Sequence, residues 1–330
     1  MPLVNKEMTK KLRDIFYRPG LTVIPGGCTP YHAIMTERAG YEAFYMSGGM
    51  THNWLIGWPD SGTVSLREMV DNANRIVKTV NIPVFSDCDT GFGNATNMYR
   101  AIQEYIRSGI AGCHIEDVEY PKGVTTSDQK PLDRGHDRER LVPIEEAVGK
   151  LKAAIDARNE LDPDFVIVAR TDARLALHGS FEEAIKRGKA YEAAGADVIM
   201  WEAMCSWEEH KAAIASVDVP SFCNTHPWAI NQDAQGNWIP GPSLTEREAA
   251  GEKIYLAVSP ALQAASEAHW ETLIDLKDRG VMAVHDRRVS DEEKPQKMRL
   301  PGDLIPVTRV RELEEKYLPT SEEKGVSKPD

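Results

Sequence analysis

The sequence predicts an α/β fold of the (β/α)8 TIM-barrel class, with additional N- and C-terminal helices. Eight short apolar runs recur along the chain, each ending at or beside a polar residue or a glycine, and each is followed by a segment of helical periodicity. Near-continuous apolar strands are typical of a parallel sheet that is buried on both faces. A doubly wound open sheet is the alternative, but no GxGxxG follows the first run, which favours the barrel.

The predicted strands and helices alternate along most of the chain. The strands are expected at residues 21–25, 43–47, 83–87, 112–116, 165–170, 197–202, 221–224 and 254–259. The clearest helices are expected at residues 65–79, 95–107, 144–158 and 181–194. This pattern predicts three parts, which are an N-terminal helix (1–20), a barrel catalytic domain (21–282) and a C-terminal helical arm and tail (283–330).

Two segments interrupt this alternation. Residues 119–141 are polar and punctuated by proline and glycine, and connections this long are usually lids or binding loops. Because they follow the fourth strand, we expect them on the catalytic face. Beyond about residue 283 the chain is charged and interrupted by proline, which predicts packing arms and a frayed tail. Apolar residues there, such as Val310 and Leu313, are candidates for docking on a neighbouring subunit.

Composition and charge narrow the class of protein. The chain has 330 residues, 42% hydrophobic and 27% charged, which is the balance of a folded body the size of one barrel enzyme. A net charge of -12 with interspersed signs argues against a nucleic-acid partner. The N-terminal residues show no signal-peptide pattern and no run is long enough for a membrane span, so we expect a cytoplasmic protein with no membrane partner. Five cysteines without a CxxC pair predict buried, reduced thiols.

Carboxylates gather where the predicted strands end. In a barrel these ends form the active site, so their polar residues are the informative ones. They are Asp60 in GWPDSG, Asp87 and Asp89 in SDCDTGFGN, Glu116 and Asp117 in HIED, and Glu202 in WEAM. So many carboxylates at one mouth would repel one another unless a cation neutralised them, and Mg²⁺ is the economical choice. We therefore expect Asp87, Asp89 and Glu116 to bind the metal; ordinary N-caps and exposed turn carboxylates are the alternative.

Positive and dipolar groups also fall at strand ends. Arg170 ends a wholly apolar strand, where an unpaired guanidinium would be costly, so we expect it to meet a carboxylate of the protein or of a substrate. Ser47, Gly48 and Gly49 end the second strand with small residues, which would let backbone N–H groups approach a substrate carboxylate. A plain turn is the alternative for these three residues.

These motifs together resemble the isocitrate lyase / phosphoenolpyruvate mutase superfamily. YMSGG, GWPDSG, DCDTGFGN, HIED, ARTDA and AGAD-x(3)-WEA occur in consistent order between about residues 20 and 265. The resemblance implies a barrel whose Mg²⁺ site involves Asp60, Asp87, Asp89 and Glu116, with Mn²⁺ as a possible substitute. It implies substrate-binding roles for Tyr45, Ser47, Gly48, Gly49, Asp60, Arg170, Glu202 and Asn224. It also implies a small anionic 2-oxo or 2-hydroxy acid as substrate, and a homotetramer with exchanged C-terminal helices.

The loop after the fourth strand departs from the lyase pattern. Lyase members that resemble this chain carry Lys-Lys-Cys-Gly-His there, whereas this chain reads YPKGVTTS at residues 120–127 and has no cysteine between Cys113 and Cys205. A Gly-His pair reappears only at His136. Pro-Lys followed by hydroxyl residues is instead similar to the gating loop of phosphonopyruvate hydrolases and phosphoenolpyruvate mutases. Those relatives, however, usually have Arg-Val-Glu-Ala where this chain has ARTDA, and lack the equivalent of Glu202.

The expected reaction is cleavage of a carbon–carbon bond by a Mg²⁺-dependent lyase. The substrate would be a substituted, malate- or isocitrate-like 2-hydroxy acid, and one product a 2-oxo acid. Glu202 or an oxygen on the metal would take the 2-hydroxyl proton, and Lys122, a loop hydroxyl or His136 would supply the proton that the cysteine gives elsewhere. Thr125 of the same loop is expected to bind the substrate. The alternatives are an oxaloacetate-type decarboxylase, a phosphonopyruvate hydrolase or mutase acting through a Mg-bound pyruvate enolate, and a catalytically silent binding barrel.

Overall fold

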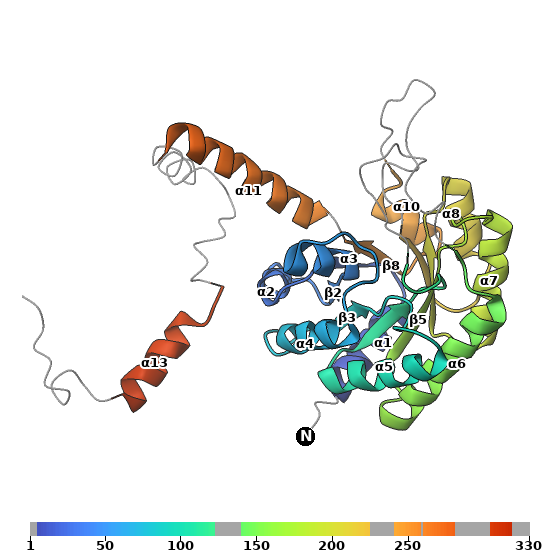
Figure 1. The fold of residues 1–330 in the computed structure, drawn as a ribbon, viewed down its shortest axis with the longest axis horizontal. Coiled ribbons are helices and arrows are strands. Elements are labelled where there is room, and N and C mark those ends of the chain that lie inside the picture. The colour runs from blue at the N-terminus through green and yellow to red at the C-terminus, as the bar shows by residue number, and fades with distance from the viewer. Residues whose placement is uncertain (1–4, 123–139, 225–240, 259, 281–303, 319–330) are drawn as a thin grey trace, which may run out of the picture. The chain divides into compact units, whose positions relative to one another are not determined.

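Eight parallel strands form the centre of the compact unit Met1–Leu262. The computed structural model describes residues 5–122, 140–224, 241–258, 260–280 and 304–318. The strands pair in the order β7-β6-β5-β4-β3-β2-β1-β8. Figure 1 shows strands inside a layer of helices. The two ends of this order meet, because the amide of Lys253 before β8 donates a hydrogen bond of 3.2 Å to the carbonyl oxygen of Ser221 in β7. The sheet is therefore a nearly closed barrel, which confirms the predicted (β/α)8 TIM barrel.

The predicted strand boundaries agree with the structure to within two residues. The strands are β1 (Thr22–Gly27), β2 (Phe44–Met46), β3 (Val84–Asp87), β4 (Gly112–Ile115), β5 (Val166–Thr171), β6 (Val198–Glu202), β7 (Ser221–Asn224) and β8 (Ile254–Ala257). Most of their residues are buried, as continuous apolar runs require.

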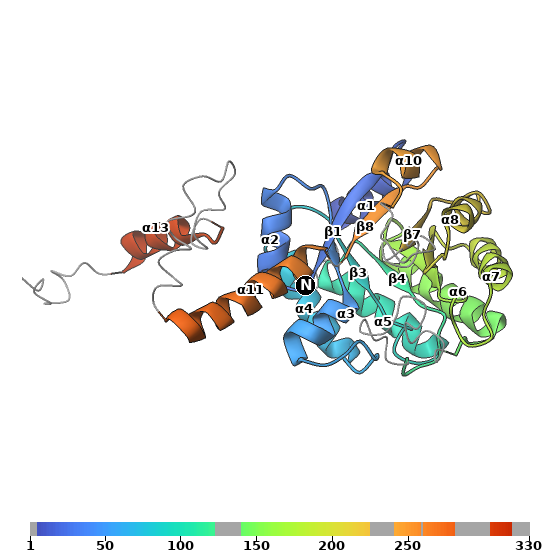
Figure 2. The same ribbon diagram turned by 90° about the horizontal axis from the view of Figure 1, so that it is seen from above.

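Within the compact unit Met1–Leu262, helices surround the strands (Figure 2). The described helices are α1 (Lys6–Tyr17), α2 (Pro30–Arg38), α3 (Gly48–Thr51), the π-helix η1 (His52–Ile56), α4 (Leu66–Val77), α5 (Ala95–Ser108), α6 (Ile144–Leu161), α7 (Phe181–Ala193), α8 (Trp207–Ile214), α10 (Leu244–Ala249), α11 (Pro260–Arg279) and α13 (Val307–Tyr317). Local chemistry explains their starts. At α4, for example, Ser65 and Glu68 form a reciprocal capping box.

Helix α1 closes the barrel at the N-terminal ends of the strands. Its residue Phe16 packs inside with Phe85 of β3 and Phe222 of β7, at ring-centroid distances of 5.7 and 6.3 Å. Arg13 of α1 also pairs with Asp197, which precedes β6, at 3.0 Å. This end is filled by side chains, so the functional groups are to be sought at the opposite, C-terminal end.

A buried charged cluster joins the last two strands of the barrel. Glu252, which precedes β8, is fully buried and accepts a 3.0 Å hydrogen bond from the amide of Cys223 in β7. Its other carboxylate oxygen lies 3.1 Å from His210 Nε2 of α8 and 3.1 Å from Arg247 Nη1 of α10. Two helices and two strands are therefore tied together where the barrel closes.

The chain divides into two compact units, Met1–Leu262 and Gln263–Asp330. The second unit holds most of α11 and all of α13, whose residues Val310 and Tyr317 are exposed. The three-part division predicted from the sequence stays a prediction. Within the described residues, no helix is both long and apolar enough to cross a bilayer. All five cysteines are free, as expected.

Candidate active site

Charged side chains are buried together where β3, β4 and β6 end. Asp87 ends β3, Glu116 follows β4, and Glu202 ends β6; each is at most 3% exposed. Asp89 lies two residues beyond β3 and is also buried. The helices after β3 and β4 begin at Asn94 and Pro143, so Asp87, Asp89 and Glu116 are neither N-caps nor exposed turn residues. Such burial of several charges requires compensating partners.

The ammonium group of Lys122 lies among three of these carboxylates. Its Nζ is 2.7 Å from Asp89 Oδ1, 3.0 Å from Asp60 Oδ1 and 3.3 Å from Glu116 Oε1. Burial by itself would lower the pKa of Lys122, but the neighbouring carboxylates raise that pKa well above its usual value. Lys122 thus keeps its proton in the metal-free protein, and its role as a general acid, expected from the sequence, stays a prediction.

Glu116 is ionised and paired with two cations. Besides Lys122, its Oε1 lies 3.2 Å from Arg170 Nη1. Burial would raise the pKa of Glu116, but Arg170 and Lys122 lower it to about 2. The sequence led us to expect a metal ion to balance these carboxylates; in the structure two protein cations, Lys122 and Arg170, also share the cluster.

The carboxylates of Asp87 and Asp89 are less fully neutralised by protein cations than that of Glu116. Burial raises the pKa of Asp87 to about 6 and that of Asp89 to about 7, although Lys122 acts in the opposite direction. The Oδ2 atom of Asp89 is buried and has no hydrogen-bond partner among the described residues. An orphaned carboxylate oxygen beside an under-neutralised pair is what a further cation would satisfy.

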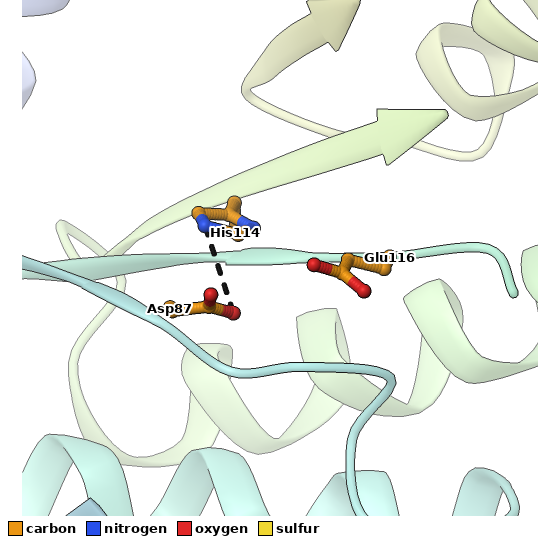
Figure 3. Close-up of side chains that lie close together, drawn as sticks. All are labelled: Asp87, His114 and Glu116. Carbon is orange, nitrogen blue, oxygen red and sulfur yellow. Dashed lines mark ion pairs between the residues drawn. The ribbon is translucent and has the colours of Figure 1, made fainter. Parts of the chain in front are cut away.

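His114 is a member of the site that the sequence analysis missed. It lies on β4 in register with Asp87, and its Nε2 is 3.6 Å from Asp87 Oδ1 (Figure 3) and 2.8 Å from the hydroxyl of Tyr45. Burial lowers the pKa of His114 to about 3, so the ring is neutral. Side-chain atoms of Asp87, His114 and Glu116 lie within 4.8 Å of one another, close enough to share a metal ion. The signal was its place in HIED, two residues before Glu116 and so on the same strand face.

Arg170 meets carboxylates of the protein, as predicted. Its Nε and Nη2 lie 3.0 and 2.6 Å from the carboxylate of Asp172, and its Nη1 is 3.6 Å from Glu202 Oε2. The side-chain amide nitrogen Nδ2 of Asn224, the last residue of β7, donates a 2.9 Å hydrogen bond to Glu202 Oε2. Arg170, Glu202 and Asn224 are thus brought together from three adjacent strands.

The Ser47-Gly48-Gly49 segment lets backbone approach the acidic cluster. The amide of Gly48 donates to Asp87 Oδ2 at 3.2 Å, and a Cβ at Gly48 would lie 2.4 Å from that oxygen. A Cβ at Gly49 would lie 2.9 Å from Asp60 Oδ2. Ser47 caps helix α3, so the segment is more than a plain turn. The N–H group that we expected to face a substrate carboxylate is directed at a protein carboxylate instead.

Replacing Gly48 with alanine is expected to lower turnover strongly. Because the added methyl group would overlap the Asp87 carboxylate, that carboxylate must move, and a displacement of about 1 Å at a reacting centre costs about 100-fold in rate. Steady-state kinetics of Gly48→Ala against Gly149→Ala, a site where a Cβ meets open space, is the measurement. Equal kcat values for the two variants would contradict the expected clash.

Two predicted site residues, Thr125 and His136, lie outside the described residues. Their proposed roles therefore remain predictions. Lys122 is the last described residue before this segment, and Arg140 is the first after it.

The metal-free protein is expected to become less stable as the pH rises from about 5 to about 8. Asp87 and Asp89 ordinarily titrate at 3.8, but their folded-state pKa values of about 6 and 7 mean that the folded chain binds more protons in this window. Glu116 and His114 act oppositely. The contribution of Glu116 is lost only as the pH falls from 4.5 toward about 2, and His114, whose pKa is lowered from 6.5 to about 3, offsets one of the two carboxylates below about pH 6.5, so a net fall in stability with rising pH remains. Thermal unfolding in a chelator checks this. A double variant Asp87→Asn/Asp89→Asn should flatten the slope, and an unchanged slope would contradict it.

Comparison with known proteins identifies the family. Residues 16–265 match the family model described as phosphoenolpyruvate phosphomutase. The chain belongs to this family. Among its relatives, a 2,3-dimethylmalate lyase of Eubacterium barkeri is 34% identical over 309 residues, which cover 93% of this chain and 97% of the relative. A 2-methylisocitrate lyase of Shewanella oneidensis is 35% identical over 269 residues, covering 81% and 83%.

Solved structures of the family share this fold. A phosphonopyruvate hydrolase in complex with oxalate and Mg²⁺ superposes with a TM-score of 0.75 at 29% identity, covering 94% of this chain and 99% of the other. The phosphoenolpyruvate mutase / isocitrate lyase superfamily expected from the motifs is confirmed. The chain is an enzyme of this superfamily, and the named relatives above include carbon–carbon lyases.

Proposed function

We propose that this member of the family is a Mg²⁺-dependent lyase that cleaves a carbon–carbon bond of a small, substituted 2-hydroxy acid and releases a 2-oxo acid. The observation that carries the proposal is the mouth of the barrel, where under-neutralised Asp87 and Asp89 lie beside Arg170 and the Glu202–Asn224 pair. The likeness to a 2,3-dimethylmalate lyase over nearly the whole chain supports the substrate class.

The residues present fit a hard divalent cation. Asp87, Asp89 and Glu116 offer carboxylate oxygens, which Mg²⁺ prefers, and we expect Mn²⁺ to substitute. Asp89 Oδ2 is the orphaned oxygen, and Asp87 makes no ion pair with Lys122 or Arg170 among the described contacts. His114 faces Tyr45 and is assigned an orienting role. When bound, the ion would supply a Lewis acid for the oxygens of the 2-oxo acid.

The chain's own side chains account for binding and proton transfer. Arg170 is expected to bind the substrate carboxylate, with Tyr45, Ser47, Gly48, Gly49 and Asp60 lining the site. Glu202, oriented by Asn224, takes the proton of the 2-hydroxyl group, and the C2–C3 bond breaks with its electron pair going to C3. A proton then adds at C3. Lys122, a hydroxyl group of the following loop and His136 are the candidates for its source.

A substrate panel tests the proposal. The purified protein with Mg²⁺ is given 2,3-dimethylmalate, 2-methylisocitrate, oxaloacetate and phosphonopyruvate, and 2-oxo acid release is followed with a coupled dehydrogenase. We expect turnover of an alkyl-substituted 2-hydroxy acid that stops when the metal is chelated. Turnover of oxaloacetate or phosphonopyruvate alone would overturn the lyase proposal.

The second candidate keeps the site and changes the leaving group. Decarboxylation of an oxaloacetate-like acid, or hydrolysis of a carbon–phosphorus bond, would pass through the same enolate of pyruvate. The loop sequence without the cysteine favours it, since loss of carbon dioxide needs no acid for the leaving fragment. Release of inorganic phosphate in the panel above distinguishes the phosphonate reaction.

We also propose that the protein assembles as a homotetramer through its C-terminal helices. Apolar side chains of α13, including Val310 and Leu313, are exposed, and none of its residues is buried. Such a face is stabilised by covering it with another subunit. Light scattering of the wild type and of Val310→Glu/Leu313→Glu tests this, with a smaller assembly expected for the variant. A cytoplasmic location remains a prediction.

A further inference from the structure

We propose that Asp172 is a positioning residue that sets the direction of the Arg170 guanidinium, and that a buried network centred on Asp117 holds Asp172 in place. The inference rests on the proposed function, in which Arg170 binds the carboxylate of the substrate. The sequence led us to expect Asp117 among the carboxylates of the barrel mouth, but its side chain contacts Arg187 and Tyr191 of α7 instead, and Asp172 was assigned no role from the sequence.

The nitrogen atoms of the Arg170 guanidinium contact two different sets of carboxylates. Asp172 binds its Nε and Nη2 at 3.0 and 2.6 Å, a two-point contact that fixes the plane of the group. The remaining nitrogen, Nη1, is the one that lies near Glu116 and Glu202. Asp172 is almost fully buried, whereas the Arg170 side chain keeps 13% exposure. One edge of the Arg170 guanidinium is thus bound by Asp172, and the other edge faces the acidic groups of the site.

Asp172 is itself held in place by Asp117. Its backbone amide donates to Asp117 Oδ1 at 3.0 Å, and the hydroxyl of the preceding Thr171 donates to Asp117 Oδ2 at 2.7 Å. The same Asp117 oxygen accepts from Tyr191 of α7 at 2.7 Å and from Arg187 of α7 at 3.2 Å. Asp117 therefore holds the end of β5 from the side that faces α7, and it is paired there with Arg187.

The two acidic neighbours Glu116 and Asp117 contact different groups. Consecutive residues point to opposite sides of an extended chain, and here Glu116 contacts Arg170 and Lys122 while Asp117 contacts α7. Without Asp172, the Arg170 guanidinium would be free to turn fully onto Glu116 and Glu202. It would then neutralise the base and present a different edge to the substrate. Asp172 prevents this collapse and acts only through Arg170.

Oxalate binding tests the inference without depending on which acid is the true substrate. Titration calorimetry with oxalate in Mg²⁺ is compared for the wild type, Asp172→Asn, Arg170→Lys and the double variant. We expect Asp172→Asn to weaken oxalate binding by about 10-fold or more, because a misdirected guanidinium loses a charge-assisted hydrogen bond to the ligand. In the Arg170→Lys background the same change should have an effect of about twofold or less, because coupled residues are not additive.

A matched control is available at the other end of the barrel. Asp197 is also a buried carboxylate paired with arginines, at 3.0 Å from Arg13 and 2.5 Å from Arg158. Asp197→Asn should lower thermal stability but leave oxalate affinity within about twofold of the wild type. If Asp172→Asn does not fold, Thr171→Val and Tyr191→Phe, which each remove one donor to Asp117, must weaken oxalate binding instead.

The outcomes separate the inference from the proposed function. A wild type that fails to bind oxalate in Mg²⁺ would refute the proposed function. A wild type that binds oxalate, with Asp172→Asn binding equally well, would refute the positioning role. The positioning role would also be refuted if the double variant lost oxalate affinity by the product of the two single-variant losses. Asp172 would then act independently of Arg170.

Discussion

Replacing Asp87 with asparagine is expected to lower kcat/KM by about a thousandfold, because several kcal/mol of transition-state stabilisation by the metal ion would be lost. Asparagine keeps the size of the side chain but removes the charge that balances a cation. Asp87 lies at the centre of the site, where it accepts from the Gly48 and Asp89 amides and lies near His114. Steady-state kinetics over a Mg²⁺ titration is the measurement.

Thermal unfolding separates this effect from misfolding. Burial raises the pKa of Asp87 to about 6, so the ionised carboxylate is a cost to the metal-free fold at pH values above that, and its removal should not lower the metal-free Tm there. Mg²⁺ should raise the Tm of the wild type but not of the variant. Asp14→Asn, at an exposed carboxylate on α1, serves as the control. A variant that keeps a Mg²⁺-dependent rise in Tm would show that Asp87 is not required for the ion.

Replacing Glu252 with alanine is expected to destabilise the fold by about 3 kcal/mol, because removal of one partner from a buried ion pair is strongly unfavourable. The change removes the carboxylate that pairs with Arg247 and His210, and it removes the acceptor for the amide of Cys223. These contacts lie where β7 and β8 close the barrel. Urea unfolding followed by circular dichroism measures the loss.

The nearby Glu248→Ala offers a direct comparison. Glu248 is exposed on the same helix as Arg247, so its replacement should change the free energy of unfolding by about 0.5 kcal/mol or less. If the two variants unfold at the same urea concentration, the Glu252 cluster does not stabilise the barrel closure.

The fold was predictable because its signals are local. Each strand of a covered parallel sheet is a short apolar run, so β7 could be placed at residues 221–224 without any knowledge of its neighbours. The barrel then dictates that the ends of these runs meet at one mouth. Asp87, Glu116 and Glu202 could therefore be grouped although they are far apart in the chain.

The pairing of charges at the site was not predictable in the same way. Whether Lys122 lies among the carboxylates or away from them depends on side-chain directions over long separations, and no periodicity encodes that. Arg170 was expected to meet a carboxylate, but its partner Asp172 was missed. Alternation along a strand places residues two apart on the same face, but it does not show whether their side chains bond to each other. His114 was missed because a single histidine in an apolar strand fits core packing equally well, and its contact with Asp87 depends on the register between β3 and β4.

The plug formed by α1 has a consequence for the order of events in turnover. With Phe16 packed against Phe85 and Phe222 at the N-terminal end of the barrel, the described residues leave the C-terminal mouth as the route for the reactants and both fragments. Under the proposed function, Arg170 and an ion at the acidic cluster would hold the 2-oxo acid at the inner end of this mouth, so the other fragment would depart before it. The 2-oxo acid should therefore leave last and compete directly with fresh substrate for the empty enzyme.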